Sequence, residues 1–518
     1  MPSLPEDVLR LVYLCAFCGD CREPDKRATS NRPFNLVCPA REYHGFEAFD
    51  ARGRMQIIRD LVEGRIRPDR SLLEWAMTCV TCGGCREVCL NNGGEGIDTP
   101  LIMEYVRNML ISMGLKTEKQ EIIVKSTLEN RNPYREPYSE RFRIIDNMGD
   151  EDSDTALFLG CTSLYRRHEI AKATIETLRL QGLKFRILKE ETCCGSVLKR
   201  MGFLEEFRKL AEHNIKLWKK EGVRRIVTPC AGCYRTIGKD YRELGLDIEV
   251  LHLVQLVDPE KIPGKLEGPV VYHDPCHLGR HMEVYEEPRR ILKKIYGEGL
   301  LEFERNRAQS WCCGAGGGVK ANMPGQALHS ALLRLKEAQE IGAEMLVSAC
   351  PFCLHNFKDA AEKYGVNIIL KDISEVIVES YKAKPKVKPP AKLEVPVRVE
   401  RPTSLMDYLR VHPEIFRELR EECKLQYRID GEEFVVERTR DGIEVRQGAE
   451  ASDIELIISR EAARKLMEAK TKQEYMKLFA EYYLHPTDDL SIDIELKKPT
   501  KKLMSLGYGE WAKKAGIM

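Results

Sequence analysis

Two pairs of adjacent cysteines are the first candidates for chemistry in this chain. The stretch ETCCGSVLKRMG contains Cys193 and Cys194, and SWCCGAGGG contains Cys312 and Cys313, each pair followed by a glycine. The chain has 19 cysteines in 518 residues, and its N-terminal stretch lacks the basic start and long apolar core of a secretion signal. In a reducing compartment, clustered cysteines indicate metal ligands or redox groups rather than disulfides.

Both pairs belong to an internal repeat of five cysteines. The first set is Cys161, Cys193, Cys194, Cys230 and Cys233, and the second set is Cys276, Cys312, Cys313, Cys350 and Cys353. The gaps are 31 and 35 residues in the first set and 35 and 36 residues in the second. Matched spacing of this kind predicts a duplicated structural unit.

Short apolar runs position these cysteines. TALFLGC, RRIVTPC, GPVVYHDPC and EMLVSAC each end at a cysteine, as buried strands do, and each C-x2-C opens a helical stretch. Alternating strands and helices predict parallel α/β units, whose sites lie at the carboxyl ends of the strands. We expect the two halves to bring their sites face to face about a pseudo-twofold axis.

Five thiolates exceed what one cubane needs. A 4Fe–4S cube takes four, one for each iron, and adjacent cysteines are too close to cap distant corners, although one of them could bridge two irons. Each set therefore suggests an opened, non-cubane cluster with an accessible iron. The alternatives are buried structural cysteines or a reactive C-x2-C dithiol. The recurring intervals favour metal binding.

The N-terminal third has the spacing of a ferredoxin. CAFCGDC is C-x2-C-x2-C, and CVTCGGCREVC is the C-x2-C-x2-C-x3-C run of bacterial ferredoxins. Because the fourth cysteine of each motif serves the other cluster in two-cluster ferredoxins, we assign two cubanes with exchanged fourth ligands. One is held by Cys15, Cys18, Cys21 and Cys89, and the other by Cys79, Cys82, Cys85 and Cys38.

The fourth ligands depart from the ferredoxin pattern. Sixteen residues separate Cys38 from the first triplet, and Cys89 is followed by Leu90 rather than proline. Zinc is the alternative metal, but two triplets of cysteines fit a tetrahedral zinc site poorly. RGRMQIIRDLVEGRI and IDTPLIMEYVRNMLISMG predict helices that brace the cluster loops.

The pattern C…CCG…C-x2-C, present twice with HDPCH and CCGAGGG in the second copy, resembles the catalytic subunit family of heterodisulfide reductase. The ferredoxin module at the N-terminal end is similar to the fused, D-type form of that catalytic subunit, over about residues 10–382. The resemblance implies two non-cubane 4Fe–4S clusters, one on each five-cysteine set. It also implies that a disulfide binds between them, that electrons arrive singly through the cubanes, and that two thiols leave.

Polar residues beside the second set have simpler interpretations. His273, His277, His281 and His355 could donate a proton to a product thiolate, but we expect them to bond nearby backbone or cluster sulfurs. Arg280 could attract an anionic substrate, but it is expected to be an ordinary surface arginine.

The electron source is expected to be another protein. GYGEWA at Gly507 follows no predicted strand, and the phosphate-binding P-loop pattern is absent. We expect no flavin or nucleotide on this chain, and a flavoprotein or membrane cytochrome b as its electron partner.

A separate module follows the cysteine-rich part. Residues 383–403 are rich in lysine and proline and predict a linker. LQYRIDGEEFVVERTRDGIEVRQG predicts a hairpin, followed by a strand in DIELIIS, two helices and a strand in DLSIDIELK. This order resembles a sterol-carrier-protein-2-like domain, which implies an apolar pocket for a lipophilic substrate or a surface that docks a partner. The alternative is a structural or interaction module without a ligand. Cys423 is expected to be a packed core residue.

The expected fold class is an α+β multidomain protein. Its parts are an α-helical ferredoxin-like domain at 1–150, a duplicated α/β domain at 151–382, the linker at 383–403 and the α+β domain at 404–518. No apolar run approaches the roughly 18–20 residues that span a bilayer. The protein is expected to be cytoplasmic, or held on the inner face of the membrane through a partner. The net charge of +1 excludes general nucleic-acid binding.

The predicted function is an iron–sulfur oxidoreductase that reduces a small-molecule disulfide to two thiols, or the reverse. The alternative is an electron-transfer subunit that links a dehydrogenase to a quinone or cytochrome without disulfide chemistry. Ten cysteines in two complete sets favour the first hypothesis, since simple electron relay needs only cubanes. A non-catalytic lipid- or partner-binding protein with structural clusters is disfavoured, because it would require four clusters that do not change redox state.

Overall fold

The computed structural model describes residues 3–22, 37–89, 91, 93–145, 148–383, 404–439, 442–469 and 471–517. It divides into two compact units, Met1–Val387 and Lys388–Met518, which are described separately. The predicted linker at 383–403 lies outside the described residues except for Ala383. Among the helices of the described ranges, none is long and apolar enough to cross a membrane.

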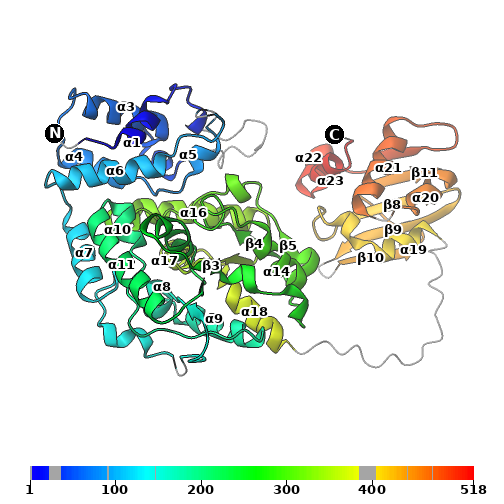
Figure 1. Cartoon of the computed structure of the whole chain (residues 1–518). Helices are drawn as coiled ribbons and strands as arrows, with labels where there is room; N and C mark the ends of the chain where they lie inside the picture. The colour runs from blue at the N-terminus through cyan, green and yellow to red at the C-terminus, as the bar shows by residue number, and fades with distance from the viewer. Residues whose placement is uncertain are drawn as a thin grey trace. The chain divides into compact units, whose positions relative to one another are not determined.

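Helices form the N-terminal part of the first unit (Figure 1). They are α1 (Glu6–Tyr13), α2 (Pro39–His44), α3 (Ala51–Val62), α4 (Arg70–Met77), α5 (Gly84–Glu87), α6 (Thr99–Ser112) and α7 (Glu118–Glu129). Aspartates define several starts: Asp50 accepts from Gly53 N, Asp69 from Leu72 N and Asp98 from Leu101 N. The predicted helices in RGRMQIIRDLVEGRI and IDTPLIMEYVRNMLISMG are confirmed as α3 and α6.

The first repeat is a parallel sheet of order β1-β2-β3 with its helices. The strands are β1 (Thr155–Leu157), β2 (Arg225–Thr228) and β3 (Glu249–His252). The helices are α8 (Cys161–Tyr165), α9 (His168–Leu180), α10 (Ser196–Met201), α11 (Leu204–Lys220), α12 (Ala231–Arg235) and α13 (Leu253–Leu256).

The second repeat has a parallel sheet of order β5-β4-β6-β7. The strands are β4 (Val270–His273), β5 (Leu300–Leu301), β6 (Met345–Ser348) and β7 (Ile369–Asp372). The helices are α14 (Glu286–Tyr296), α15 (Val319–Asn322), α16 (Pro324–Glu340), α17 (Pro351–Tyr364) and α18 (Ile373–Lys382).

The predicted parallel α/β arrangement is confirmed in both repeats. β1, β2, β4 and β6 are the four predicted strands, and a cysteine follows the carboxyl end of each within four residues. The β2 strand does not alternate buried and exposed side chains. Its residues from Ile226 to Thr228 are all buried, as in a sheet that is covered on both faces. The same hydrophobic core runs through the N-terminal helices and both repeats.

The second unit is a mixed sheet of order β10-β9-β8-β11-β12. Its strands are β8 (Lys424–Ile429), β9 (Glu432–Thr439), β10 (Gly442–Gln447), β11 (Ile454–Ile458) and β12 (Ile492–Leu496). Its helices are α19 (Leu405–Val411), α20 (Arg460–Leu466), α21 (Lys472–Leu484), α22 (Thr500–Ser505) and α23 (Tyr508–Lys514). The hairpin, the later strands and the two helices between β11 and β12 agree with the predicted order. Cys423 is fully buried in this core, as predicted.

Candidate metal centres

The glycine after each cysteine pair explains the repeated Cys-Cys-Gly sequence. Gly195 N donates to Cys193 Sγ and Gly314 N donates to Cys312 Sγ, both at 3.4 Å. Both glycines have positive φ, 74° and 86°. A Cβ would lie 2.9 Å from the Phe207 ring in the first repeat and 2.4 Å from Ser330 Cβ in the second. Only glycine can make this turn and let the neighbouring helix approach.

The first set gathers five buried thiols at the carboxyl edge of its sheet. Cys194 Sγ and Cys233 Sγ are 3.4 Å apart, and Cys161 and Cys193 share a hydrogen bond. That bond lowers the pKa of Cys193 well below its ordinary value and raises the pKa of Cys161 well above it. Sulfurs this close share protons or, when deprotonated, a metal.

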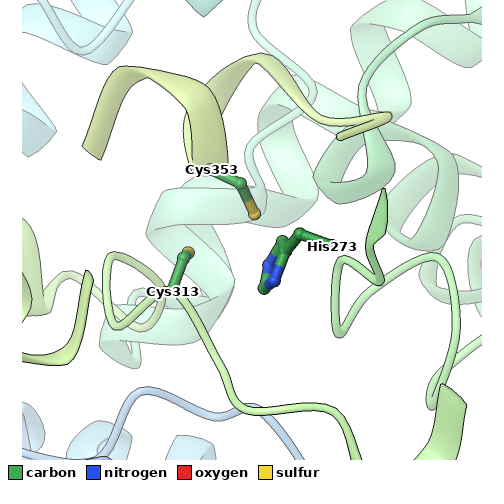
Figure 2. A group of neighbouring side chains, drawn as sticks. All are labelled: His273, Cys313 and Cys353. Atoms are coloured by element: carbon green, nitrogen blue, oxygen red, sulfur yellow. The ribbon is translucent and has the colours of Figure 1, made fainter. Parts of the chain in front are cut away.

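The second set is arranged in the same way. Cys312 Sγ lies 4.0 Å from Cys276 Sγ, and Cys313 shares a hydrogen bond with Cys353. Figure 2 shows the imidazole of His273 beside the sulfurs of Cys313 and Cys353, and the three ligand atoms lie within 4.8 Å of one another. The side chain of His273 interacts with that of Cys313, in line with the prediction that these histidines bond nearby backbone or cluster sulfurs.

The two sets meet between the repeats. Cys230 and Cys350, the first cysteines of the two C-x2-C pairs, share a hydrogen bond. Cys230 directly precedes α12 and Cys350 directly precedes α17, and each follows a strand of its own sheet. The predicted face-to-face placement of the two halves is therefore confirmed at this pair.

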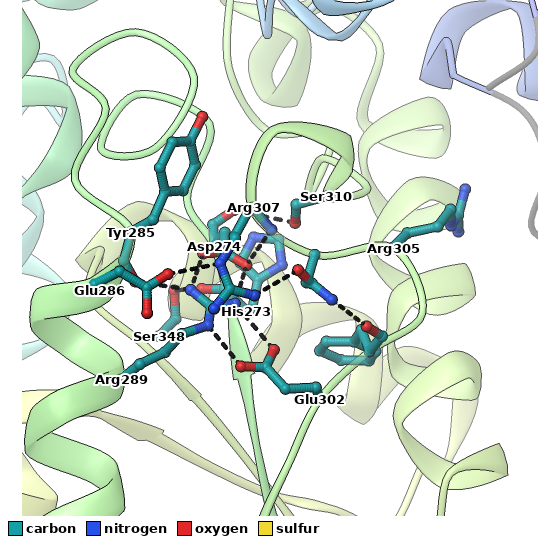
Figure 3. A network of polar contacts seen from close by, with 12 residues as sticks. His273, Asp274, Tyr285, Glu286, Arg289, Glu302, Arg305, Arg307, Ser310 and Ser348 are labelled. Carbon is teal, nitrogen blue, oxygen red and sulfur yellow. Dashed lines mark hydrogen bonds and ion pairs between the residues drawn. The ribbon is translucent and has the colours of Figure 1, made fainter. Parts of the chain in front are cut away.

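Polar contacts fix the loop that carries Cys276. Asp274 accepts two hydrogen bonds from Arg289, at 2.7 and 2.9 Å, and a third from Arg307 N at 3.0 Å. Figure 3 shows this network, in which Ser310 Oγ also donates to Asp274 O. Because a bidentate arginine holds a carboxylate in one orientation, the strand end leading to Cys276 is rigid.

The ferredoxin-type cysteines lie in two neighbouring groups. Cys15, Cys18, Cys21, Cys85 and Cys89 line one recess. Burial raises the pKa of Cys15, and the nearby Cys89 raises it as well. Burial raises the pKa of Cys38 to about 12, with further increases from Cys79 and Cys82. Cys89 therefore lies near the first triplet, and Cys38 near the second. Cys85, assigned to the second cubane, lies between the groups, because it borders the recess of the first triplet and also interacts with Cys82 and Cys38.

The second ferredoxin motif contacts the second repeat directly. Cys312 hydrogen-bonds to Cys82 and lowers the pKa of the Cys82 thiol to about 6. Arg280 Nε donates to Cys82 O at 2.8 Å, and its Nη1 donates to the carbonyls of Ala308 and Ser310. The prediction that Arg280 lies on the surface is wrong: its side chain is buried, since three carbonyl acceptors compensate the loss of water.

The other histidines have different surroundings. His281 Nε2 lies 3.2 Å from Thr81 O, and His355 Nδ1 lies 3.1 Å from Arg167 Nη2. His277 Nε2 is buried and has no hydrogen-bond partner among the residues that the structure describes. Burial lowers the pKa of His277 well below its ordinary value, as do Arg235 and Arg200. A neutral His277 is poorly suited to serve as an imidazolium acid.

The sequence analysis missed two buried arginines near the sets. Arg141, fully buried, lies close enough to Cys161 for their charges to interact, and Arg334 Nε donates to His273 Nδ1 at 3.3 Å. Neither arginine belongs to a recognisable sequence motif, so the sequence alone did not indicate that they lie near the cysteines.

A family model described as "CCG: Cysteine-rich domain" matches residues 155–238 and 270–358. The two matches confirm the duplication inferred from the cysteine spacing. They start at β1 and β4, and they include all ten cysteines of the two sets.

Several curated proteins are similar to this chain. A subunit of "Dihydromethanophenazine:CoB--CoM heterodisulfide reductase" from Methanosarcina barkeri is 38% identical over 320 residues, which cover 58% of this chain and 77% of that protein. A subunit of "Fumarate reductase (CoM/CoB)" from Methanothermobacter marburgensis is 32% identical, covering 58% and 61%. "EtfAB:quinone oxidoreductase" from Syntrophomonas wolfei is 27% identical, covering 58% and 45%. With its duplicated cysteine-rich domain and this identity, the chain is an iron–sulfur oxidoreductase that belongs to the family of the D-type heterodisulfide reductase subunits.

Proposed function

We propose that this chain interconverts a small-molecule disulfide and two thiols at two five-thiolate iron–sulfur centres, the first set and the second set. The observation that carries the proposal is the contact between Cys230 and Cys350, because it places the two sets side by side. Two adjacent centres can each receive one sulfur of a broken S–S bond, so that no free thiyl radical has to form.

The residues present fit iron–sulfur clusters. Nine of the ten cysteines of the two sets are buried, and Cys276 is partly exposed. Iron–sulfur clusters are held by such thiolates, and a bound cluster would supply the electrons and an accessible iron. We assign one non-cubane 4Fe–4S cluster to each set. The cubanes keep the ligands predicted from the sequence, which the nearness of Cys89 to Cys15 and of Cys38 to Cys79 supports.

The protein itself contributes position and exclusion of water. The cysteine loops are fixed by Gly195, Gly314 and the contacts of Asp274 with Arg289. Electrostatic interactions near the buried sulfurs are stronger than they would be in water, because little water is present there to screen them. Arg280 and the Cys82–Cys312 contact support entry of electrons from the ferredoxin-type part into the second set.

The partners are proposed from the relatives. The Methanosarcina relatives carry "Dihydromethanophenazine:CoB--CoM" in their names, which points to a thiol–disulfide substrate and to a second electron-carrying subunit. We propose a flavoprotein or a membrane cytochrome b as that partner. Such a partner would hold this chain in the cytoplasm or at the inner face of the membrane.

An electron-transfer subunit is the second candidate. The similarity to "EtfAB:quinone oxidoreductase" favours it, because that name contains a flavoprotein and a quinone but no disulfide. In that case the sets would pass electrons to a quinone or cytochrome and leave disulfides unchanged.

The second unit is proposed to be sterol-carrier-protein-2-like, on the order of its strands and helices. It would either receive a lipophilic ligand or dock a partner.

A coupled assay separates the two candidate functions. Anaerobic full-length protein is mixed with reduced viologen and the CoB–CoM heterodisulfide, and both viologen oxidation and free thiols are counted. The proposal predicts two thiols for every two electrons, and loss of this activity in Cys193→Ser and Cys312→Ser. Cys423→Ser is the control, because this buried thiol belongs to neither set. Viologen oxidation by a quinone, with no thiol released from the disulfide, would instead establish the electron-transfer subunit.

A further inference from the structure

The two repeats differ at one position beside their sulfurs. Residues 155–238 and 270–358 match the same family model, and Phe158 and His273 each stand three residues before the first cysteine of their set. Both side chains are fully buried. A ring that can form hydrogen bonds therefore occupies the position in the second repeat that an apolar ring occupies in the first.

Arg334 determines which ring nitrogen of His273 carries the proton. A guanidinium carries only donors, so the 3.3 Å contact from Arg334 Nε makes His273 Nδ1 an acceptor. The single ring proton of a neutral imidazole must then be on Nε2. Arg334 is itself held by Glu337, at 2.7 Å, and by the carbonyl of Arg305 at 3.0 Å, so its orientation is fixed.

The protonated nitrogen is the one left for the sulfurs. The ring of His273 lies beside Cys313 and Cys353, as Figure 2 shows, and the side chain of Cys313 acts on the pKa of His273. Since Nδ1 is taken by Arg334, Nε2–H is the proton left to face the sulfurs. Within the described residues Nε2 has no hydrogen-bond partner, so its proton is free to bond the Cys313 sulfur once that sulfur is a thiolate.

The first repeat has no such donor at the equivalent position. The ring of Phe158 packs against Trp218, with ring centroids 6.1 Å apart. Each set has one buried arginine whose charge acts on its cysteines, Arg141 on Cys161 and Arg280 on Cys276. Because those charges act in the same direction, His273 is a difference between the two surroundings that the arginines do not cancel.

We propose that His273 is a positioning residue that donates its Nε2–H to the Cys313 thiolate and raises the reduction potential of the second centre alone. This inference rests on the proposed function, since it requires an iron–sulfur centre on the second set. A hydrogen bond to a metal-bound thiolate withdraws electron density from the sulfur and favours the reduced centre. Hydrogen bonds to charged groups are worth about a tenfold change in an equilibrium constant or more.

The first test uses the unaltered chain. Full-length protein is prepared with histidine labelled with ¹⁵N at either Nε2 or Nδ1, and electron–nuclear double resonance is recorded on the reduced clusters. We expect a weak coupling to ¹⁵Nε2 that disappears in His273→Gln labelled in the same way. The proposal is overturned by the absence of coupling, by coupling to Nδ1 instead, or by the strong coupling of a nitrogen bound directly to iron.

The second test measures potentials. In His273→Phe, which installs the residue of the first repeat, we expect the equilibrium constant for one-electron reduction of the second centre to fall about tenfold, or about 59 mV. His273→Gln keeps an amide donor and should recover part of the shift, while Phe158→Leu should leave the second centre unchanged. Unchanged potentials in His273→Phe with full iron content would refute the inference and leave the proposed function intact. A chain that binds no iron at the two sets would refute the proposed function itself.

Discussion

Arg280 Nε donates to the carbonyl of Cys82 at 2.8 Å and so joins the ferredoxin-type loop to the second repeat. The two residues are almost two hundred positions apart in the sequence, yet Cys82 also hydrogen-bonds to Cys312. Arg280 is one of several buried side chains that hold these two cysteine loops together, since His281 also contacts Thr81 O and Arg107 donates to both Cys79 O and Gly317 O.

Arg280→Ala should destabilise the first unit. The carbonyls of Cys82, Ala308 and Ser310 would each lose a buried donor, and one such unsatisfied group costs about 1–3 kcal/mol. We expect a loss of about 2–5 kcal/mol in the free energy of unfolding, measured by urea titration of the full chain. Arg290→Ala, an exposed arginine on α14, should change it by less than about 0.5 kcal/mol. Equal effects of the two substitutions would contradict the bridging role of Arg280.

A buried charge network should contribute far more to the free energy of unfolding than an exposed ion pair. Arg200 bonds Glu104 at 2.5 Å and also bonds Asp240, and all three side chains are buried. Arg200→Met would remove the nearest cation from both carboxylates, leaving Asp240 with Lys199 at 2.8 Å and Glu104 with Arg235 at 3.6 Å, and should cost up to about 3–5 kcal/mol. Arg225→Met breaks the exposed pair with Glu249 and should cost about 0–1 kcal/mol. Urea titrations at one pH compare the two, and a cost for Arg200→Met as small as that for Arg225→Met would show that the network contributes little.

Asp372 should make the first unit less stable as pH rises. Burial raises the pKa of this carboxyl to about 8, and its Oδ2 has no hydrogen-bond partner within the described structure. The folded chain therefore holds a proton that the unfolded chain releases above its ordinary pKa of about 4. Stability should fall between about pH 4 and pH 8, by up to about 1.4 kcal/mol per pH unit, and then level off.

Asp372→Asn tests that pH dependence. Its Oδ1 can still accept from Ser374 N, which Asp372 caps at 2.9 Å. The variant should lose the slope between pH 4 and pH 8 and be more stable than the parent at pH 8. The exposed Asp247→Asn serves as the control and should keep the parent slope. Parallel pH profiles for the parent and Asp372→Asn would disprove the raised pKa.

Gly314→Ala should disturb the second set. The added Cβ would lie 2.4 Å from Ser330 Cβ at a residue with φ of 86°, so the cysteine loop or α16 must move. We expect a cost of about 2–5 kcal/mol from left-handed strain and overpacking together, with less iron bound per chain. Gly182→Ala has a similar φ, 73°, but open space around the new Cβ, and should cost only about 1–2 kcal/mol with full iron content. The same iron loss in both variants would rule out the packing explanation.

The local elements were predictable because their residues carry local signals. The runs before Cys161, Cys230, Cys276 and Cys350 are apolar and short, and they form the strands β1, β2, β4 and β6. The duplication followed from cysteine intervals, because ligands of one centre must recur together. In the second unit, Asp430-Gly431 gave the β8–β9 turn, where both residues have positive φ.

The contacts between distant segments were not predictable. Arg280 has no sequence feature that distinguishes it from a surface arginine; its burial depends on where the carbonyls of Cys82, Ala308 and Ser310 meet. The Cys82–Cys312 and His273–Arg334 contacts likewise join segments that only the packed structure brings together. Spacing along the chain identifies candidate ligands of a centre, while tertiary packing decides what surrounds them.

Electron paramagnetic resonance tests the central claim most directly. Anaerobically purified protein is oxidised with and without coenzyme M, and the Cys194→Ser, Cys313→Ser and Cys423→Ser variants are treated in the same way. If the two sets bind substrate sulfur, a new paramagnetic signal appears only with the thiol, is lost in Cys194→Ser or Cys313→Ser, and persists in Cys423→Ser. Reducible cubane signals that do not respond to thiol in the unaltered protein would contradict disulfide chemistry at the two sets.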